Sequence, residues 1–251
     1  MKAERPIKPQ FLDPRILTHV RKHNKFIGKR EREDGIDDFN NWTIRHSSLE
    51  DYGTTFNSIL APENLDNLLS IIASRPNKTT ILDLMASDAA VLQSVRDYGI
   101  NFGLAVSLGY RPRKNSGPYR EFCSNLNGDL TIKKTWSKIR KVAESKGFEY
   151  FDIIICRPEG GILDSRLTTS TLFFMLQESW RLLSYDDGVF LFQIPQCQYF
   201  EAEKYFSKLK QKGFSIDWSE SVNGFMTHAV VLSKRKESPS VLPSPLMLGM
   251  K

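Results

Sequence analysis

The stretch TTILDLMASDAAVLQSV, residues 79–95, decides how this sequence is interpreted. Its first half contains ILDLM, an apolar run without alternation, which is typical of a strand covered on both faces. Its second half has the composition of a helix, so the stretch predicts a buried strand, a turn and a helix. In an open parallel sheet such a turn lies at the carboxyl edge, where ligands bind. The turn, residues 85–89, contains no glycine, although glycine lets a backbone approach a ligand closely.

The same pattern continues after Pro76, with short apolar runs and amphipathic segments in alternation. Runs such as FDIIIC and GVFLFQI are apolar throughout, as buried parallel strands are. Alternating strands and helices predict a doubly wound, mostly parallel α/β sheet with right-handed crossovers. The last two of seven expected strands follow one another without a helix, which predicts an antiparallel hairpin at one edge. Strands are expected at 79–85, 102–108, 119–124, 151–156, 188–194, 214–219 and 227–233, and helices at 88–98, 133–146, 168–183 and 198–212.

The chain divides into a head, one domain and a tail. Residues 1–36 form a basic extension, and the domain of residues 37–234 has a helical lead-in, 37–75, before an α/β core, 76–234. Within the lead-in, PENLDNLLSIIA predicts a helix because a proline starts it and apolar residues recur on one face. Residues 235–251 are rich in Ser and Pro, and we expect a disordered tail whose apolar LMLGM is available to a partner.

The basic character of the chain belongs to its two ends. Of the net charge of +6, residues 1–34 hold ten Lys or Arg against five acids and residues 234–251 hold four against one, so the remainder is near −2. A positive segment attracts nucleic-acid phosphates without reading sequence, which makes the head a candidate RNA contact. The alternative is a solvated extension that only aids solubility.

Composition argues against several classes of protein. No apolar run approaches the roughly eighteen residues of a membrane span, and the N-terminus lacks the apolar stretch of a signal peptide. We therefore expect a cytoplasmic protein without a membrane partner. Cys123, Cys156 and Cys197 are far apart and outside any C-x-x-C pattern, which predicts neither a disulfide framework nor a metal site.

The strand, acid and turn in ILDLMASDA are followed by NGDL at 127–130, FDIIICRPEGG at 151–161, LLSYDDGVFLFQIP at 182–195 and the closing hairpin. In this order the segments resemble the class I S-adenosylmethionine-dependent methyltransferases. The resemblance spans residues 62–234 and depends on order and pattern more than on one motif. It implies a Rossmann-like methyltransferase fold, S-adenosylmethionine as the cofactor, and methyl transfer as the reaction.

The resemblance also implies cofactor-binding residues. Asp83 matches the acid that ends the first strand and orients both the loop and the amino-acid part of the cofactor. Met85, Ser87 and Ala89 stand where the family has the three glycines of G-x-G-x-G. Ser107 stands where an acid usually takes both ribose hydroxyls. Methionine is bulky for its place, and a hydroxyl loses the bidentate contact, so these departures weaken the site that the fold implies.

Further positions carry the resemblance at the ends of the third and fourth strands. Asp129 falls where the family places an acid near the adenine amino group, although an acid before a helix is equally a turn or N-cap residue. Cys156 ends the fourth strand and is the last candidate cofactor contact. The CRPEGG that starts there lacks the Asn/Asp-Pro-Pro-Tyr motif of base-amine methylation, and Gln193 replaces a lysine that 2′-O-methyltransferases need. Glu159 and Asp164 are the acids nearest the expected methyl position, and each is either a general base or a capping residue.

Three functions follow from these residues. The leading hypothesis is a divergent S-adenosylmethionine-dependent methyltransferase that acts on RNA or protein, because Asp83 and Asp129 retain parts of the pocket. The alternative is a catalytically inactive methyltransferase-like protein that binds a protein partner or serves as a scaffold. The bulk of Met85 and the charge of Asp88 favour it. Ser107 followed by YRPRK also suits the 2′-phosphate of NADP, but no G-x-G-x-x-G motif accompanies it.

Overall fold

The computed structural model describes residues 79–84, 90–97, 102–109, 123–130, 132–156, 169–195, 199–218 and 227–250. The basic extension 1–36 and the whole helical lead-in 37–75 lie outside these ranges, so both stay predictions. The described elements are β1 (Thr80–Leu84), α5 (Ala90–Asp97), β2 (Leu104–Gly109), β3 (Cys123–Asn127), α6 (Lys133–Ser145), β4 (Ile153–Cys156), α8 (Thr169–Leu182), β5 (Gly188–Pro195), α9 (Tyr199–Gln211), β6 (Ser215–Trp218), β7 (Thr227–Lys234) and the 3-10 helix η3 (Leu246–Leu248). Among them no helix is both long and apolar enough to cross a membrane.

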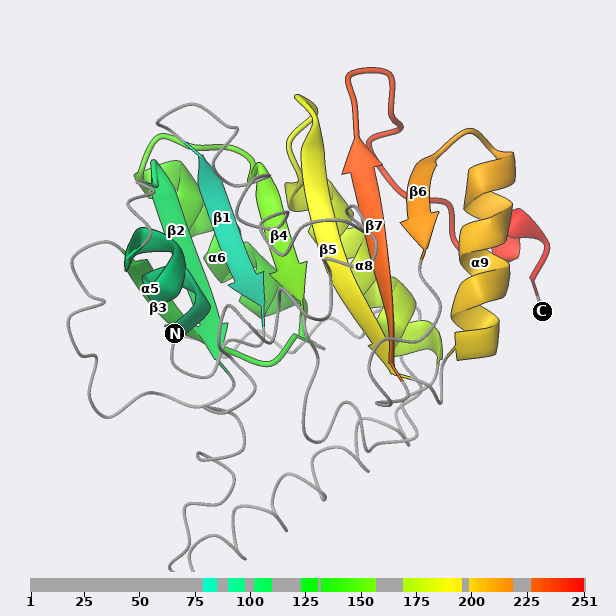
Figure 1. Ribbon diagram of the computed structural model, residues 1–251, viewed down its shortest axis with the longest axis horizontal. Coiled ribbons are helices and arrows are strands. Elements are labelled where there is room, and N and C mark those ends of the chain that lie inside the picture. Colours follow the sequence, from blue (N-terminus) through cyan, green and yellow to red (C-terminus); the bar gives the residue numbers. More distant parts are fainter. Residues whose placement is uncertain are drawn as a thin grey trace, which may run out of the picture.

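The strands form one seven-stranded sheet in the order β3-β2-β1-β4-β5-β7-β6 (Figure 1). β1 pairs in parallel with β2 and β4, β2 with β3, and β4 with β5. β7 runs antiparallel to both of its neighbours, β5 and β6. The prediction of a doubly wound, mostly parallel sheet with an antiparallel hairpin at one edge is confirmed.

Strand β3 is displaced from its predicted position. We expected a strand at 119–124, and the structure places β3 at Cys123–Asn127, with Cys123 beside Ala105 of β2. As the outermost strand on its side, β3 buries only its first residue, so its apolar pattern is weak. Its register is therefore set by pairing with β2 and not by a hydrophobic pattern that sequence analysis can detect.

Alternation along the strands separates the two faces of the sheet. One face carries Leu84, Ile154 and Phe192 into a core that they share with α6, α8 and α9. Helix α5 lies on the opposite face, in front of the sheet in Figure 1, where α6 and α8 lie behind it. The carboxyl half of β1 therefore presents Leu84 to the large core and Asp83 to the α5 side.

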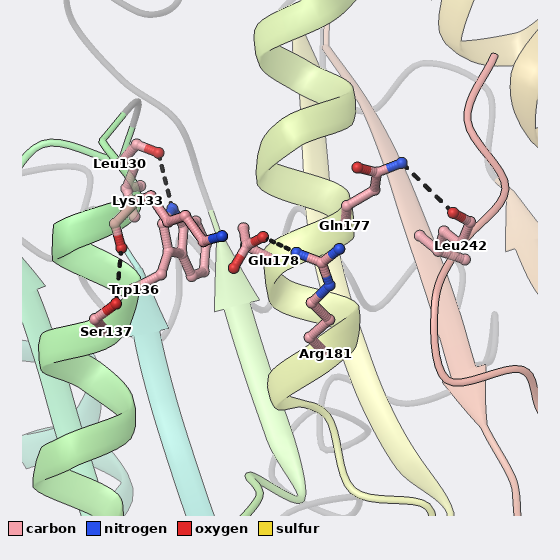
Figure 2. A network of polar contacts seen from close by, with 8 residues as sticks. All are labelled: Leu130, Lys133, Trp136, Ser137, Gln177, Glu178, Arg181 and Leu242. Atoms are coloured by element: carbon pink, nitrogen blue, oxygen red, sulfur yellow. Dashed lines mark hydrogen bonds and ion pairs between the residues drawn. The ribbon is translucent and has the colours of Figure 1, made fainter. Parts of the chain in front are cut away.

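Helix α6 shows why the core-facing helices form. Trp136, Ile139 and Ala143 recur at helical spacing and are buried, whereas most of the lysines between them are exposed. The indole Nε1 of Trp136 donates to the main-chain oxygen of Leu130 at 2.9 Å (Figure 2). Its ring meets Phe174 of α8 edge to face, with the ring centroids 6.4 Å apart, so α6 and α8 pack directly against each other.

Residues 235–250, which we call the strap, pack against α8 and α9, and the expectation of a disordered tail is wrong for them. Leu242, Leu248 and Met250 of the strap are buried. The prediction weighed the Ser and Pro content of the segment and missed these apolar anchors, because their partners come from helices distant in sequence. Three side chains of α8 and α9, which belong to the body of the domain (residues 79–234), also donate to main-chain carbonyls of the strap. Trp180 Nε1 donates to Pro239 at 2.8 Å, Gln177 Nε2 to Leu242 at 3.4 Å (Figure 2), and Tyr205 Oη to Pro243 at 2.9 Å.

Candidate functional site

The direction of winding reverses between β1 and β4. From β1 the chain proceeds outward to β2 and β3, then returns to β4 on the other side of β1 and continues to β5. β1 and β4 end together at the carboxyl edge, where Leu84 lies beside Cys156. Loops leaving such a point diverge to opposite faces, and ligands of open α/β sheets bind in the crevice between them. The candidate site is therefore the carboxyl edge of β1, β2, β3 and β4.

Asp83 is the described carboxylate that lies within the strands at this edge. It is the fourth residue of β1 and is 1% exposed. A buried carboxylate is costly unless polar groups hold it, and Asp83 is not without a partner. Because it is enclosed, the carboxylate contacts neighbouring protein groups and not bulk solvent. The orienting role that the resemblance implies for it stays a prediction.

The register brings two polar residues into line with Asp83. β2 places Ser107 beside Asp83, and β3 places Asn125 beside Ser107. Adjacent residues of paired parallel strands share a face, so the three positions form a row across the carboxyl halves of three strands. The structure describes the main chain of Ser107, and it leaves the side chain of Asn125 partly exposed. The sequence prediction missed Asn125 because the expected strand ended at residue 124.

Cys156 lies at its predicted position, but its side chain belongs to the core. It ends β4, is 0% exposed and is one of the residues of the large apolar cluster. Burial raises the pKa of the Cys156 thiol well above its ordinary value, and the charge of Asp83 raises it further. The thiol is therefore protonated and poorly reactive. The main chain of Cys156, and not its sulfur, is the part that this arrangement offers to a ligand.

The turn between β3 and α6 is tight and leaves Asp129 near the edge. A Cβ atom on Gly128 would lie 2.6 Å from Cγ2 of Thr135, so the turn packs directly on the first turn of α6. Helix α6 has Ile132 as its N-cap residue, which means that Asp129 does not occupy the N-cap position. Its main-chain oxygen accepts from Ile132 N at 3.0 Å, and its side chain is partly exposed. Asp129 is therefore a turn residue and not the N-cap residue of α6, and its ligand-facing role stays a prediction.

Four predicted site residues lie outside the described part of the chain. Met85 and Ser87 belong to the glycine-free turn after β1, and Glu159 and Asp164 follow β4. Their roles stay predictions. The described half of the site consists of the strand ends and the β3–α6 turn.

The protein is similar to several solved structures. A candidate methyltransferase from Streptococcus mutans in complex with SAH is 10% identical, with a TM-score of 0.46, over 66% of this chain and 95% of that chain. A candidate hemolysin from Lactococcus lactis is 14% identical, with a TM-score of 0.46, over 76% of this chain and 90% of that chain. A TehB-like SAM-dependent methyltransferase from Corynebacterium glutamicum is 15% identical, with a TM-score of 0.43, over 66% and 86%. No family model and no curated protein matches the sequence.

The strand order, the parallel crossovers and the antiparallel edge decide the architecture. The fold is a Rossmann-like, doubly wound α/β fold with an antiparallel hairpin at one edge. This strand arrangement agrees with the fold that the resemblance implies. One fold hosts many functions, so the activity has to be argued from the site itself.

Proposed function

We propose that the protein is a divergent S-adenosylmethionine-dependent methyltransferase whose methyl acceptor is RNA. The observation that carries the proposal is the buried carboxylate of Asp83 at the point where the winding of the sheet reverses, in register with Ser107 and Asn125. Burying an apolar side chain at this position would cost less free energy than burying a carboxylate. The presence of Asp83 there therefore favours a binding role.

The described residues fit this cofactor. Asp83 would orient the turn after β1 and the amino-acid part of the cofactor. Ser107 and Asn125 would bind the ribose, and Asp129 would bind the adenine amino group. When bound, the cofactor supplies a methyl group already activated by a positively charged sulfur. The protein then has to bind and align the two reactants, which is a large part of the acceleration such a reaction needs. Glu159 and Asp164 stay the candidates for removing a proton from the acceptor.

Calorimetric titration with S-adenosylmethionine and S-adenosylhomocysteine tests the cofactor assignment. We expect micromolar binding to the intact protein and binding at least about tenfold weaker to Asp83→Asn, because the amide keeps the shape but loses charge-assisted hydrogen bonds. Asp152→Asn is the matched control. Asp152 accepts from Thr80 N at 2.8 Å and Thr80 Oγ1 at 3.0 Å at the amino edge, so its loss affects stability and not binding.

The outcome separates the two leading hypotheses. If the folded protein takes up neither compound at millimolar concentration, it is not a methyltransferase, and the inactive binding or scaffold protein becomes the better account. Equal weakening in Asp83→Asn and Asp152→Asn would assign Asp83 a structural role only.

The RNA substrate is proposed from the charge of the N-terminal segment. Residues 1–34 hold ten Lys or Arg against five acids. Removing them is expected to weaken RNA binding and to flatten its dependence on salt, because fewer counterions are released from the phosphates. Filter binding between low and physiological salt measures both quantities, and cofactor affinity serves as the folding control. Unchanged RNA affinity would mark the segment as a solvated extension and leave a protein as the acceptor to test.

A further inference from the structure

The strap contacts the body of the protein as a peptide ligand contacts its binding site. Its polar contacts with α8 and α9 use main-chain carbonyls, which accept from Gln177, Trp180 and Tyr205. Donors that bind carbonyls recognise an extended backbone, and prolines favour that conformation with little loss of entropy. The apolar anchors Leu242 and Leu248, 1% and 7% exposed, add burial to this recognition.

The side chains of α8 and α9 that meet the strap are also held by residues outside it. The ring of Phe173 lies against Tyr205 with centroids 4.4 Å apart, and Trp180 lies against Phe214 at 5.7 Å. Burial raises the pKa of the Tyr205 phenol, so it keeps its proton and stays a donor. Two of the three donors are therefore positioned by residues of α8, α9 and the segment before β6.

The junction between the body and the strap is short and exposed. Lys234, the last residue of β7, is 0% exposed, whereas residues 235–237 are exposed. In this turn Arg235 N donates to Ser238 Oγ and Ser238 N donates to Arg235 O, each at 2.9 Å. Changes in a few backbone angles there would release the strap and leave the sheet intact. An identical face on another copy offers the strap every contact it lost, which is the condition for exchange between protomers.

We propose that the face of α8 and α9 that carries Gln177, Trp180 and Tyr205 is a peptide-binding site, that the strap is its detachable ligand, and that a second copy of this chain supplies the strap in exchange. A tethered strap has an effective concentration in the millimolar range and excludes a free one. Two closed chains and an exchanged pair of identical chains make the same strap contacts, so exchange is favoured when one copy has a weakened strap and the other has a weakened face. The proposal involves no residue of the carboxyl edge, so it holds or fails independently of methyl transfer.

The test uses the full chain with Leu242→Ser and Leu248→Ser, and a synthetic peptide of residues 236–251 as the probe. We expect the peptide to bind this double variant, one per chain, and to raise its melting temperature, whereas a scrambled peptide has no effect and the unaltered chain binds neither. Adding Tyr205→Phe should weaken peptide binding about fivefold, the effect of one hydrogen bond. A folded double variant that does not bind the peptide overturns the proposal.

Light scattering on a concentrated mixture tests exchange between copies, with the double variant supplying the face and Gln177→Ala with Tyr205→Phe supplying an intact strap whose own face is weakened. A dimer in the mixture, absent from either variant alone, supports exchange. Peptide binding without any dimer would show that the strap serves only its own chain, which overturns the second-copy part of the proposal.

Hydrogen exchange on the full chain covers the case in which the double variant does not fold. With Tyr205→Phe alone, the amides of 248–250, which are bonded within the strap, should exchange about fivefold faster while those of β1 and β4 keep their protection. Equal acceleration in the strap and in β1 would make the strap an integral part of the core and would overturn the proposal.

Discussion

Replacing Gly188 with alanine is expected to lower the free energy of unfolding by about 3 kcal/mol, the upper range for overpacking. A Cβ atom at Gly188, the first residue of β5, would lie 2.4 Å from the main-chain oxygen of Ser184 and 2.8 Å from Cγ of Leu183. Neither neighbour can retreat easily, because Ser184 N donates to Phe151 O at 2.8 Å and Leu183 is 0% exposed. The added methyl group must therefore displace the backbone that joins α8 to β5.

Urea denaturation measures this loss, and Gly147→Ala is its matched control. A Cβ atom on Gly147 would have no atom within 4 Å, but the residue has a φ of 81°, so alanine there causes backbone strain alone, about 1 kcal/mol. A loss at Gly188 no larger than that at Gly147 would mean that the α8–β5 connection yields to a methyl group.

Lys234→Met is expected to lower the free energy of unfolding by about 2 kcal/mol at pH 7. The Lys234 Nζ donates to the main-chain oxygens of Trp180 at 2.8 Å and Leu183 at 2.9 Å, and it lies 3.6 Å from the ring centroid of Tyr185. These carbonyls lie at the end of α8, where a helix favours a cation, and the aromatic ring favours it further. Methionine fills the space but cannot donate, and both carbonyls lose this donor. The methionine variant no longer has to bury an ammonium group, but this gain offsets only part of the free energy lost with the two hydrogen bonds.

Lys236→Met, two residues further on and exposed, is the control and should change stability by less than about 0.5 kcal/mol. Equal stability of Lys234→Met and Lys236→Met would show that the buried ammonium adds nothing to the join between β7 and α8.

The contribution of Lys234 should also depend on pH. Burial lowers the pKa of Lys234 from 10.5 to about 8, so above pH 8 the folded protein releases a proton that the unfolded chain retains. The unfolded state then binds more protons, and stability rises with pH between about 8 and 10.5. The neutral amine still has two N–H bonds for the two carbonyls. The stability gap between the unaltered chain and Lys234→Met should therefore widen over this range, and a gap that narrows would contradict the assigned environment.

Sequence analysis located the elements but not the pairing of the outermost strand. The runs ILDLM, FDIIIC and GVFLFQI are apolar because both faces of β1, β4 and β5 are covered, so their lengths and order were predictable. β3 lies at the end of the parallel part and is mostly unburied, so its position depends on hydrogen bonds with β2. That register adds Asn125 to the candidate site.

The charge pattern shows the same limit. Lys234 counts among the four basic residues of the C-terminal segment, yet it is buried under aromatic rings and contributes nothing to a basic surface. The strap likewise has a composition typical of disorder, although its Leu and Met residues are buried against α8 and α9. Composition records which groups are present, whereas their solvation depends on what packs against them.

The stretch at residues 79–95 by itself determined a buried strand that leads into a helix, because a continuous apolar run and a helical pattern need no distant partner to be recognised. It also placed Asp83 at the end of that strand. Only the tertiary structure decided that Asp83 is enclosed at the reversal of the sheet, that Cys156 faces the core, and that the strap covers two helices. These outcomes depend on contacts between segments far apart in the chain, whose energies no local pattern contains.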